Sequence, residues 1–220
     1  MFCNQRCLLI VITLCPTSFS DFELLTEEDS KSLVMKVASK SWQLDAIPFK
    51  LCIDVLWPVI LTMIYSALRS GHVPSSWKNA FITPLLKKPG LELVYNNYRP
   101  VSNLSFISKL TVFKQLHAYF ASNNLYPWNQ SAYRPNKQRV TLLVLLDLSA
   151  AFNTVDHQIL LNRLHSDFGI TGTALEWFSS YLKDRKQRAL IDGVSSQAAD
   201  LSYGVPQGSC LGPLLFTLYI

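Results

Sequence analysis

The sequence contains few cysteines and no CxxC pair. Their number is five, an odd total, and no CxxC motif joins any two of them. They are Cys3, Cys7, Cys15, Cys52 and Cys210. Disulfide frameworks and structural zinc sites depend on paired cysteines, so neither is expected here. This usage favours a reducing compartment, and we expect an intracellular location, in the cytoplasm or nucleus, rather than secretion.

Long apolar runs are also missing from the sequence. The nearest to one is CLLIVITLC, residues 7–15, which follows Arg6 and is too short to cross a bilayer. This segment is similar to the core of a signal peptide. Residues 1–17 are therefore either a weak signal-like segment or an unrelated leader joined to the domain. We expect no membrane among the partners of the chain.

Acidic residues are scarce between residues 72 and 140, where Glu92 is the only one. The same stretch holds nine basic residues, Lys78, Lys87, Lys88, Arg99, Lys109, Lys114, Arg134, Lys137 and Arg139. A polyanion-binding surface needs this composition, although a solvated lysine-rich face has it too. The whole chain of 220 residues has a net charge of +5 and is 49% hydrophobic, so it can form a core and is not globally disordered.

The pattern that is present is a mixture of helices and strands, without internal repeats. Apolar residues at helical spacing predict helices over 26–40, 49–68 and 106–124, and we expect Pro58 to break or kink the second. Asp156 is a candidate N-cap for a helix that extends through Leu164. A further helix follows Gly172, and its apolar stripe consists of Ala174, Trp177, Phe178, Tyr181 and Leu182.

Strand patterns occur in three places. Residues 79–90 are typical of a short strand that enters a turn, and residues 142–148 form an apolar run typical of a central strand covered on both faces. Two short strands are expected around the Asp192-Gly193 turn. After them comes a Gly/Pro loop that leads into a helix starting near Pro213.

The central strand predicted over 142–148 carries a carboxylate, Asp147, near its carboxyl end. A carboxylate in such a place can hold a hard divalent cation, although an isolated aspartate is more often a cap or a turn residue. The small residues Ala150 and Ala151 leave the backbone accessible, and Phe152 adds a flat ring. Together they favour a nucleotide site in which the ring limits what fits at the sugar. An ordinary core ring is the alternative for Phe152.

Four segments carry a resemblance to a known family: NNYRPVSNL, QSAYRPN, LLDLSAAFNTVDH and GVPQGSCLGPLLFTLYI. Together and in this order they resemble the reverse transcriptase of LINE-type (non-LTR) retrotransposons, particularly the L2/CR1 sort, from about Ser18 to Ile220. The resemblance implies an α+β fold, a right-hand polymerase with fingers and a partial palm, an incomplete sheet and no thumb. We expect a leader over 1–17, a helical N-terminal extension over 18–71, a basic fingers-like region over 72–140 and a partial palm over 141–220.

The resemblance also implies roles for single residues. Asp147 matches the first catalytic aspartate, a ligand of two magnesium ions, with the carbonyl of Leu148 beside it. Phe152 matches the steric gate that excludes a ribose 2′-hydroxyl. Gln207 matches the glutamine that lies against the incoming nucleotide, and Gly208 allows close approach of the backbone.

Two arginines, Arg99 and Arg134, match basic positions of the fingers that face the triphosphate or the template. The implied partners are an RNA template, a DNA primer and a deoxynucleoside triphosphate, with no defined protein partner.

The chain also departs from the family pattern. The family continues to a paired-aspartate motif and a thumb, so only one of three expected metal carboxylates is present, and Asp156 is no substitute. Asn153 stands where the family usually has an aspartate, and the fingers are shortened after Arg134. We therefore expect weak or no magnesium binding and no polymerase activity by this chain itself.

A second hypothesis follows from the same departures. The chain is then a non-catalytic RNA-binding or interaction module that retains the basic fingers. Under either hypothesis we expect a final helix without a cap and an open sheet edge, and hence marginal stability.

Overall fold

Six helices and one small mixed sheet make up the part of the chain that the computed structural model describes, which is residues 16–37, 49–94, 97–104, 109–126, 151–191, 193–206 and 211–220. The helices are α1 (Glu27–Val37), α2 (Phe49–Ser70), α3 (Lys109–Ser122), α4 (His157–Ser166), α5 (Gly172–Leu182) and α6 (Leu211–Tyr219). The strands are β1 (Asn79–Leu86), β2 (Tyr98–Leu104), β3 (Arg185–Ile191), β4 (Val194–Ser195) and β5 (Ala199–Leu201). The predicted α+β class is confirmed.

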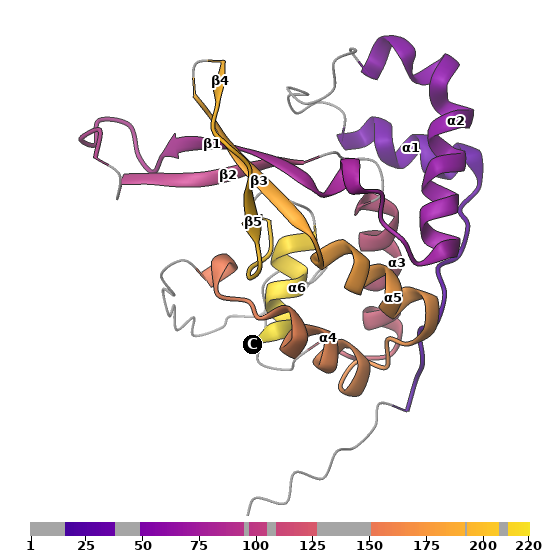
Figure 1. The fold of residues 1–220 in the computed structure, drawn as a ribbon. Helices are drawn as coiled ribbons and strands as arrows, with labels where there is room; N and C mark the ends of the chain where they lie inside the picture. The colour runs from indigo at the N-terminus through magenta and orange to yellow at the C-terminus, as the bar shows by residue number, and fades with distance from the viewer. Residues whose placement is uncertain are drawn as a thin grey trace, which may run out of the picture.

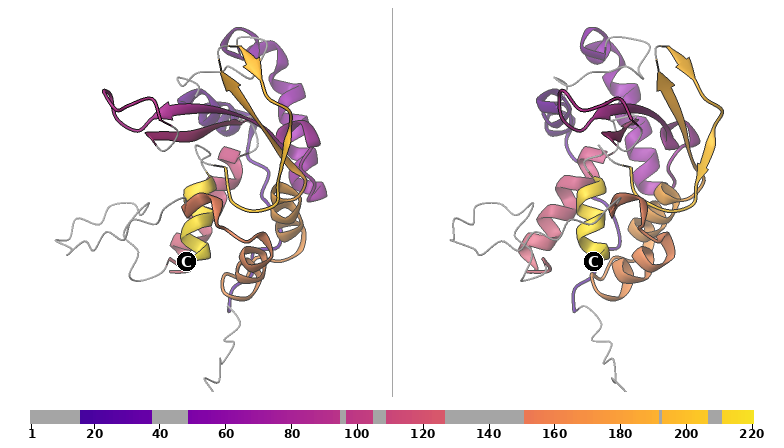
Figure 2. Two further views of the ribbon diagram at one scale, coloured as in Figure 1. Left: turned by 60° about the vertical axis from the view of Figure 1, so that its left-hand side comes forward. Right: turned by 90° about the vertical axis from the view of Figure 1, so that its left-hand side faces the viewer.

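The sheet is built around one parallel pair of strands. β1 pairs in parallel with β3, from Asn79 opposite Lys186 to Ile82 opposite Ala189. On its other edge β1 pairs with β2 as an antiparallel hairpin, and β3 pairs antiparallel with both β4 and β5. Figures 1 and 2 show that the far ends of β1–β2 and β3–β4 project away from helices α3–α6. The sheet thus presents two hairpin ends beyond these four helices.

Three of the local features predicted for the second half are present. The carboxylate of Asp156 accepts hydrogen bonds from the backbone N–H groups of Gln158 at 2.8 Å and Ile159 at 3.0 Å, so the N-cap prediction for α4 is confirmed. The hairpin around the Asp192-Gly193 turn forms between β3 and β4. The apolar stripe predicted for the helix after Gly172 is fully buried in α5, and its members are Ala174, Trp177, Phe178, Tyr181 and Leu182.

Of the two effects predicted for Pro58, a break or a kink in helix α2, the break does not occur. The helix continues through this residue over 22 positions and ends at Ser70. A proline inside a helix removes one hydrogen bond and costs about 3 kcal/mol. On one side the helix buries Trp57, Leu61, Ile64, Ala67 and Leu68, whose transfer from water outweighs that cost.

Two features of the sheet were not predicted. Strand β2 lies within the NNYRPVSNL segment, and the parallel pairing of β1 with β3 joins segments about a hundred residues apart. Pro84 and Pro100 stand opposite each other in the β1–β2 pair, and neither has a backbone N–H to donate. The strand predicted over 142–148 lies outside the described residues.

The core cluster gathers residues that lie far apart in the sequence. Phe22 and Ile64 come from before residue 72, Val112 from α3, and Leu160 and Leu215 from α4 and α6; all five are buried in one cluster. Within the part of the chain that the structure describes, no helix has the length and apolar character that crossing a bilayer demands.

Residues 16–22, here called the N-terminal strap, are held against the turn between α4 and α5. The N–H of Phe19 donates to the carbonyl of Gly169 at 2.9 Å, and the N–H of Thr171 donates to the carbonyl of Phe19 at 3.0 Å. Phe22 is buried and meets the ring of Trp177 edge-on at 5.7 Å. The strap therefore closes the core from the amino-terminal side.

The approach of the strap depends on a glycine. Gly169 has a φ of +65°, and a Cβ at this position would lie 2.0 Å from the carbonyl oxygen of Thr17. No side chain fits there unless the strap moves away. A residue without a Cβ is therefore required both by the backbone angle and by the space.

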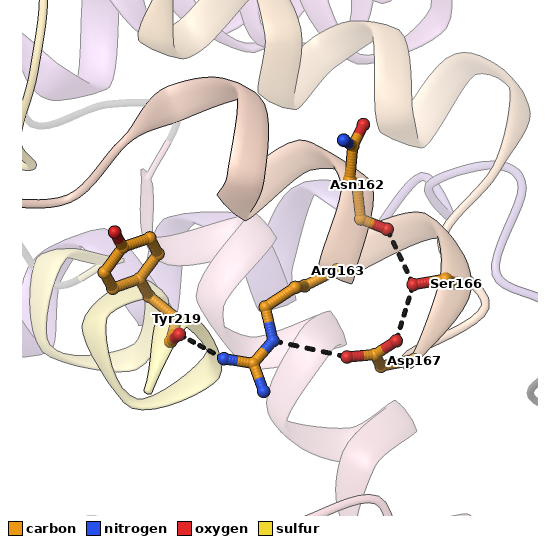
Figure 3. A network of polar contacts seen from close by, with 5 residues as sticks. All are labelled: Asn162, Arg163, Ser166, Asp167 and Tyr219. Carbon is orange, nitrogen blue, oxygen red and sulfur yellow. Dashed lines mark hydrogen bonds and ion pairs between the residues drawn. The ribbon is translucent and has the colours of Figure 1, made fainter. Parts of the chain in front are cut away.

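The end of α6 is held by an arginine from a neighbouring helix. Nη1 of Arg163 in α4 donates to the carbonyl of Tyr219 in the last turn of α6, as Figure 3 shows. Nε of the same side chain pairs with Asp167 at 3.3 Å, and Ser166 bonds to Asp167 in turn. The expectation that this helix ends without a cap is wrong, because the cap comes from a residue 56 positions away that no local pattern indicates.

We predict that Gly169→Ala destabilises the fold much more than Gly90→Ala does. Gly90 has a similar φ of +82°, but an added Cβ there meets nothing within 4 Å. The matched variant therefore measures backbone strain alone, which costs about 1–2 kcal/mol. Gly169→Ala adds displacement of the strap and should cost about 3 kcal/mol or more by urea denaturation. Equal losses in the two variants would show that the strap contributes nothing.

Candidate functional site

The structure describes the side chain of one of the predicted site residues, Phe152. The backbone of Arg99 lies in β2, opposite Leu85 in β1. The structure does not describe the side chain of Arg99. The remaining predicted site residues all lie outside the described residues; they are Asp147, Leu148, Arg134, Gln207 and Gly208. The geometry of the site is therefore built from the segments that flank them.

Phe152 lies in a short 3-10 turn, Ala151–Asn153, and is half-buried. Its ring packs on the ring of Phe216 in α6, with the ring centres 5.3 Å apart and the planes inclined by 44°. Both rings lie at the margin of the core rather than inside it. Phe152 thus has one supported side and one side that the core does not cover.

Residues 152–155 pair with residues 204–205 through the backbone. The N–H of Val205 donates to the carbonyl of Phe152 at 2.7 Å, and the N–H of Gly204 donates to the carbonyl of Val155 at 2.7 Å. Val155 and Val205 are both buried beside these bonds. We call this pairing the latch. It brings the segment of Phe152 next to the segment that leads to Gln207, two residues after Val205.

The latch depends on Gly204. Its φ is +86°, and a Cβ here would lie 2.8 Å from the carbonyl oxygen of Phe152 and 2.9 Å from Cα of Asn153. Both contacts are with backbone, which cannot swing aside as a side chain can. Only glycine therefore allows the two segments to approach this closely.

A side chain reinforces the latch. Nε2 of His157, the first residue of α4, lies 2.7 Å from the carbonyl oxygen of Gly204. A carbonyl can only accept, so Nε2 carries the proton in this contact. Both polar backbone groups of Gly204 are therefore bonded to the chain that follows Phe152.

The basic residues of 72–140 do not all face the solvent. Lys87 and Lys88 are exposed where β1 ends, and Lys114 is exposed on α3. Lys78 is only 6% exposed. Burial lowers the pKa of Lys78; nearby Asp184 opposes that shift, and Arg185 and Lys183 add to it. Lys78 therefore does not contribute to a polyanion-binding surface, and its inclusion among the candidate residues is wrong.

Arg185 is the second buried cation. It is 1% exposed, its Nη1 donates to the carbonyl of Tyr181 at 2.9 Å, and its guanidinium lies 4.8 Å from the centre of the Tyr181 ring. Burial lowers the pKa of this side chain, and Tyr181 acts in the opposite sense. Arg185 thereby ties the end of α5 to the start of β3 and does not face a ligand.

No group of three or more His, Cys, Asp or Glu residues within the described ranges is placed to hold a metal ion. Asp156, the carboxylate nearest in sequence to Phe152 among these residues, is occupied as the N-cap of α4. Its Oδ1 accepts both of the N–H groups that it caps. None of the described residues is therefore assigned as a magnesium ligand.

Sequence reasoning missed three residues of this site, His157, Gly204 and Val205. All three lie inside motifs that were identified, His157 at the end of LLDLSAAFNTVDH and the other two at the start of GVPQGSCLGPLLFTLYI, but none was given a role. The signal available was the glycine before the VPQG segment, because a lone glycine beside a buried valine often marks a close approach of two backbones. The sequence did not indicate which backbone would approach.

Comparison with known proteins agrees with the motifs. The family model described as "Reverse transcriptase (RNA-dependent DNA polymerase)" matches residues 86–220. A probable RNA-directed DNA polymerase from transposon BS of Drosophila melanogaster is 30% identical in an alignment that covers 72% of this chain and 20% of that protein. The RNA-directed DNA polymerase from mobile element jockey of Drosophila funebris is 28% identical in an alignment that covers 89% of this chain and 24% of the relative.

A transposon protein from another organism is also similar. The transposon TX1 uncharacterized 149 kDa protein of Xenopus laevis is 28% identical in an alignment that covers 88% of this chain and 16% of that protein. The chain spans less than a quarter of each of these relatives. The family model covers more than half of the chain, and the resemblance to LINE-type elements predicted from the motifs is confirmed. The chain belongs to the reverse transcriptase (RNA-dependent DNA polymerase) family.

Proposed function

We propose that this chain forms the fingers and part of the palm of an RNA-directed DNA polymerase of a non-LTR retrotransposon. Its partners in the intact enzyme are an RNA template, a DNA primer and a deoxynucleoside triphosphate. The observation that carries the proposal is the latch, because it joins the segment of Phe152 to the segment of Gln207. In the family these two segments contact the same nucleotide, so they must lie together for that function.

The proposed roles on the palm follow the family motifs. In the intact enzyme Asp147 and the carbonyl of Leu148 would hold magnesium, which would activate the primer 3′-hydroxyl and stabilise the triphosphate. The ring of Phe152 excludes a ribose 2′-hydroxyl. Gln207 lies against the nucleotide, and Gly208 lets the backbone approach it.

The proposed role of the fingers is to grip phosphates. Arg99 and Arg134 face the triphosphate or the template, where their guanidinium groups can form paired hydrogen bonds to phosphate oxygens. The exposed Lys87 and Lys88 extend the positive charge to the end of the β1–β2 hairpin. These contacts are electrostatic and carry no sequence preference.

The support that Phe152 receives from Phe216 is consistent with a gate. A ring that discriminates by shape must hold one position, because a ring free to rotate would make room for the extra hydroxyl. The 5.3 Å contact between the two rings restrains Phe152 from one side. Its uncovered side is then the surface that meets the sugar.

A second candidate function is an RNA-binding module without catalysis. The observation that favours it is the exposure of Lys87, Lys88 and Lys114, all within the segment that contains a single acidic residue. Binding of this kind needs no metal carboxylates. RNA binding therefore requires fewer of the family's functional residues than polymerisation does.

We predict that residues 1–220 alone do not extend a primer. The 220 residues contain no adjacent pair of aspartates, so the charge that holds two divalent ions together is incomplete. In a primer-extension assay with an RNA template, magnesium and four deoxynucleotides, the chain and its Asp147→Ala variant should both give the background signal. Extension that disappears in Asp147→Ala would contradict this expectation.

We predict that Phe152→Ala reduces the preference for deoxynucleotides. The unsubstituted chain should bind dATP more tightly than ATP, and removal of the ring should bring the two affinities together, a relative change of about tenfold. Fluorescence titration with labelled nucleotides measures both affinities. Phe113→Ala is the matched control, because Phe113 is also a half-buried ring at the margin of the core. An unchanged ratio of the dATP and ATP affinities in Phe152→Ala, or no dATP binding by the unsubstituted chain, would rule out the proposed nucleotide site.

We predict that RNA binding weakens steeply with salt and depends on the β1–β2 hairpin. Replacing Lys87 and Lys88 by glutamine should make the fall of log affinity with log salt shallower, by about one to two in the magnitude of the slope. Each lost phosphate contact on a single strand accounts for about 0.7 of that magnitude. Filter binding of a single-stranded RNA over a salt series gives the slope. The control replaces the exposed Arg69 and Lys183 by glutamine, which removes the same charge elsewhere. The same change in both double variants would place the interface outside the hairpin.

A further inference from the structure

We infer that His157 is a positioning residue for the nucleotide-contacting loop, because its imidazole holds residues 204–206 beside Phe152. The inference rests on the proposed function for its meaning, since the loop matters as the one that leads to Gln207. It goes beyond the proposed function by assigning a role to a residue of the TVDH motif that contacts no substrate. The residue acts through the backbone of Gly204.

The contact is short and its direction is fixed. Nε2 of His157 lies 2.7 Å from the carbonyl oxygen of Gly204, 47 positions along the chain. Because the carbonyl only accepts, the imidazole must be in the tautomer protonated on Nε2 or in the doubly protonated form. The bond exists in either of these forms and is lost in the other neutral tautomer.

The imidazole is presented from a rigid element. His157 begins α4, and the start of that helix is set by the carboxylate of Asp156, which accepts two backbone N–H groups. The helix is anchored further along by Leu160 and Leu164, both fully buried. The position of the ring is therefore set by the helix, and the loop adjusts to it.

The helix itself gains nothing from a histidine at this position. The first turn of a helix favours acidic side chains, because its free N–H groups carry partial positive charge. A histidine there offers no cap, and Asp156 already supplies one. The presence of an imidazole is explained by its contact with Gly204.

The loop needs a side-chain donor at this point. The N–H groups of Gly204 and Val205 are used by the carbonyls of Val155 and Phe152. The next residue, Pro206, has no N–H, so the backbone pairing cannot continue in the same way. The carbonyl of Gly204 accepts its hydrogen bond from a side chain, the imidazole of His157.

Two substitutions separate the donor from the bulk of the ring. His157→Gln keeps an N–H donor at a similar reach, and His157→Leu fills the space without one. The first readout is hydrogen exchange of the Val205 amide by NMR, with the amide of Ala174, bonded to Ser20, as internal reference. The second readout is the affinity for dATP with magnesium. Thermal melting verifies that both variants fold.

The inference expects Val205 exchange to become about tenfold faster in His157→Leu and to stay within about threefold of the unsubstituted chain in His157→Gln. The affinity for dATP should fall about tenfold in the leucine variant and be kept in the glutamine variant. Unchanged exchange in His157→Leu, or identical behaviour of the two variants, would overturn the inference. So would faster exchange with unchanged dATP affinity, because the loop would then be placed without His157.

A measurement on the unsubstituted chain guards against a leucine variant that does not fold. Nitrogen chemical shifts of the His157 ring should report a proton on Nε2, and a ring protonated only on Nδ1 would refute the contact. The failure of the proposed function gives a different pattern. In that case no variant binds dATP while the exchange difference remains, so the contact survives and its nucleotide role does not.

Discussion

The pairing of residues 152–155 with residues 204–205 is the constraint on which the rest of the site depends. It closes a loop of about fifty residues that contains α4, α5 and strands β3–β5. Closing a loop of this length costs about 3 kcal/mol of chain entropy. Two backbone hydrogen bonds at about 1 kcal/mol each do not meet that cost, whereas burial of Trp177 and Phe178 at about 2 kcal/mol or more each exceeds it. Hydrophobic burial therefore closes the loop, and the hydrogen bonds decide its register.

Register matters here because the two paired segments carry different chemistry. A shift by one residue would put the carbonyl of another residue opposite Val205 and turn Phe152 away from Phe216. Gly204 opposes such a shift, since any other residue moved into its place would bring a Cβ that collides with the backbone of Phe152 and Asn153. The same sterics act at Gly169, where the N-terminal strap crosses the turn between α4 and α5. At both places a glycine fixes which backbone atoms can approach.

Local patterns predicted the elements whose causes are local. The stripe of α5, the Asp156 cap and the β3–β4 hairpin depend on residues within one or two turns of each other, and all three are confirmed. The β1–β3 pairing, the Arg163 contact with Tyr219 and the latch join residues 47 or more positions apart, and no periodicity indicates them. The motifs identified Phe152 and the loop before Gln207 separately. Their contact is a property of the fold, and the burial of Lys78 is another.

The support for the ring of Phe152 involves several elements of the fold. Its ring is restrained by Phe216, which is carried by α6. That helix buries Leu211, Leu214, Leu215 and Leu218, and its last turn is held by Arg163 from α4. Helix α4 in turn begins at the residue that bonds Gly204. The support therefore forms a closed circuit in which α4 fixes both the loop beside the ring and the helix behind it. A site that selects by shape needs such support, because a looseness of about 1 Å is enough to lose discrimination.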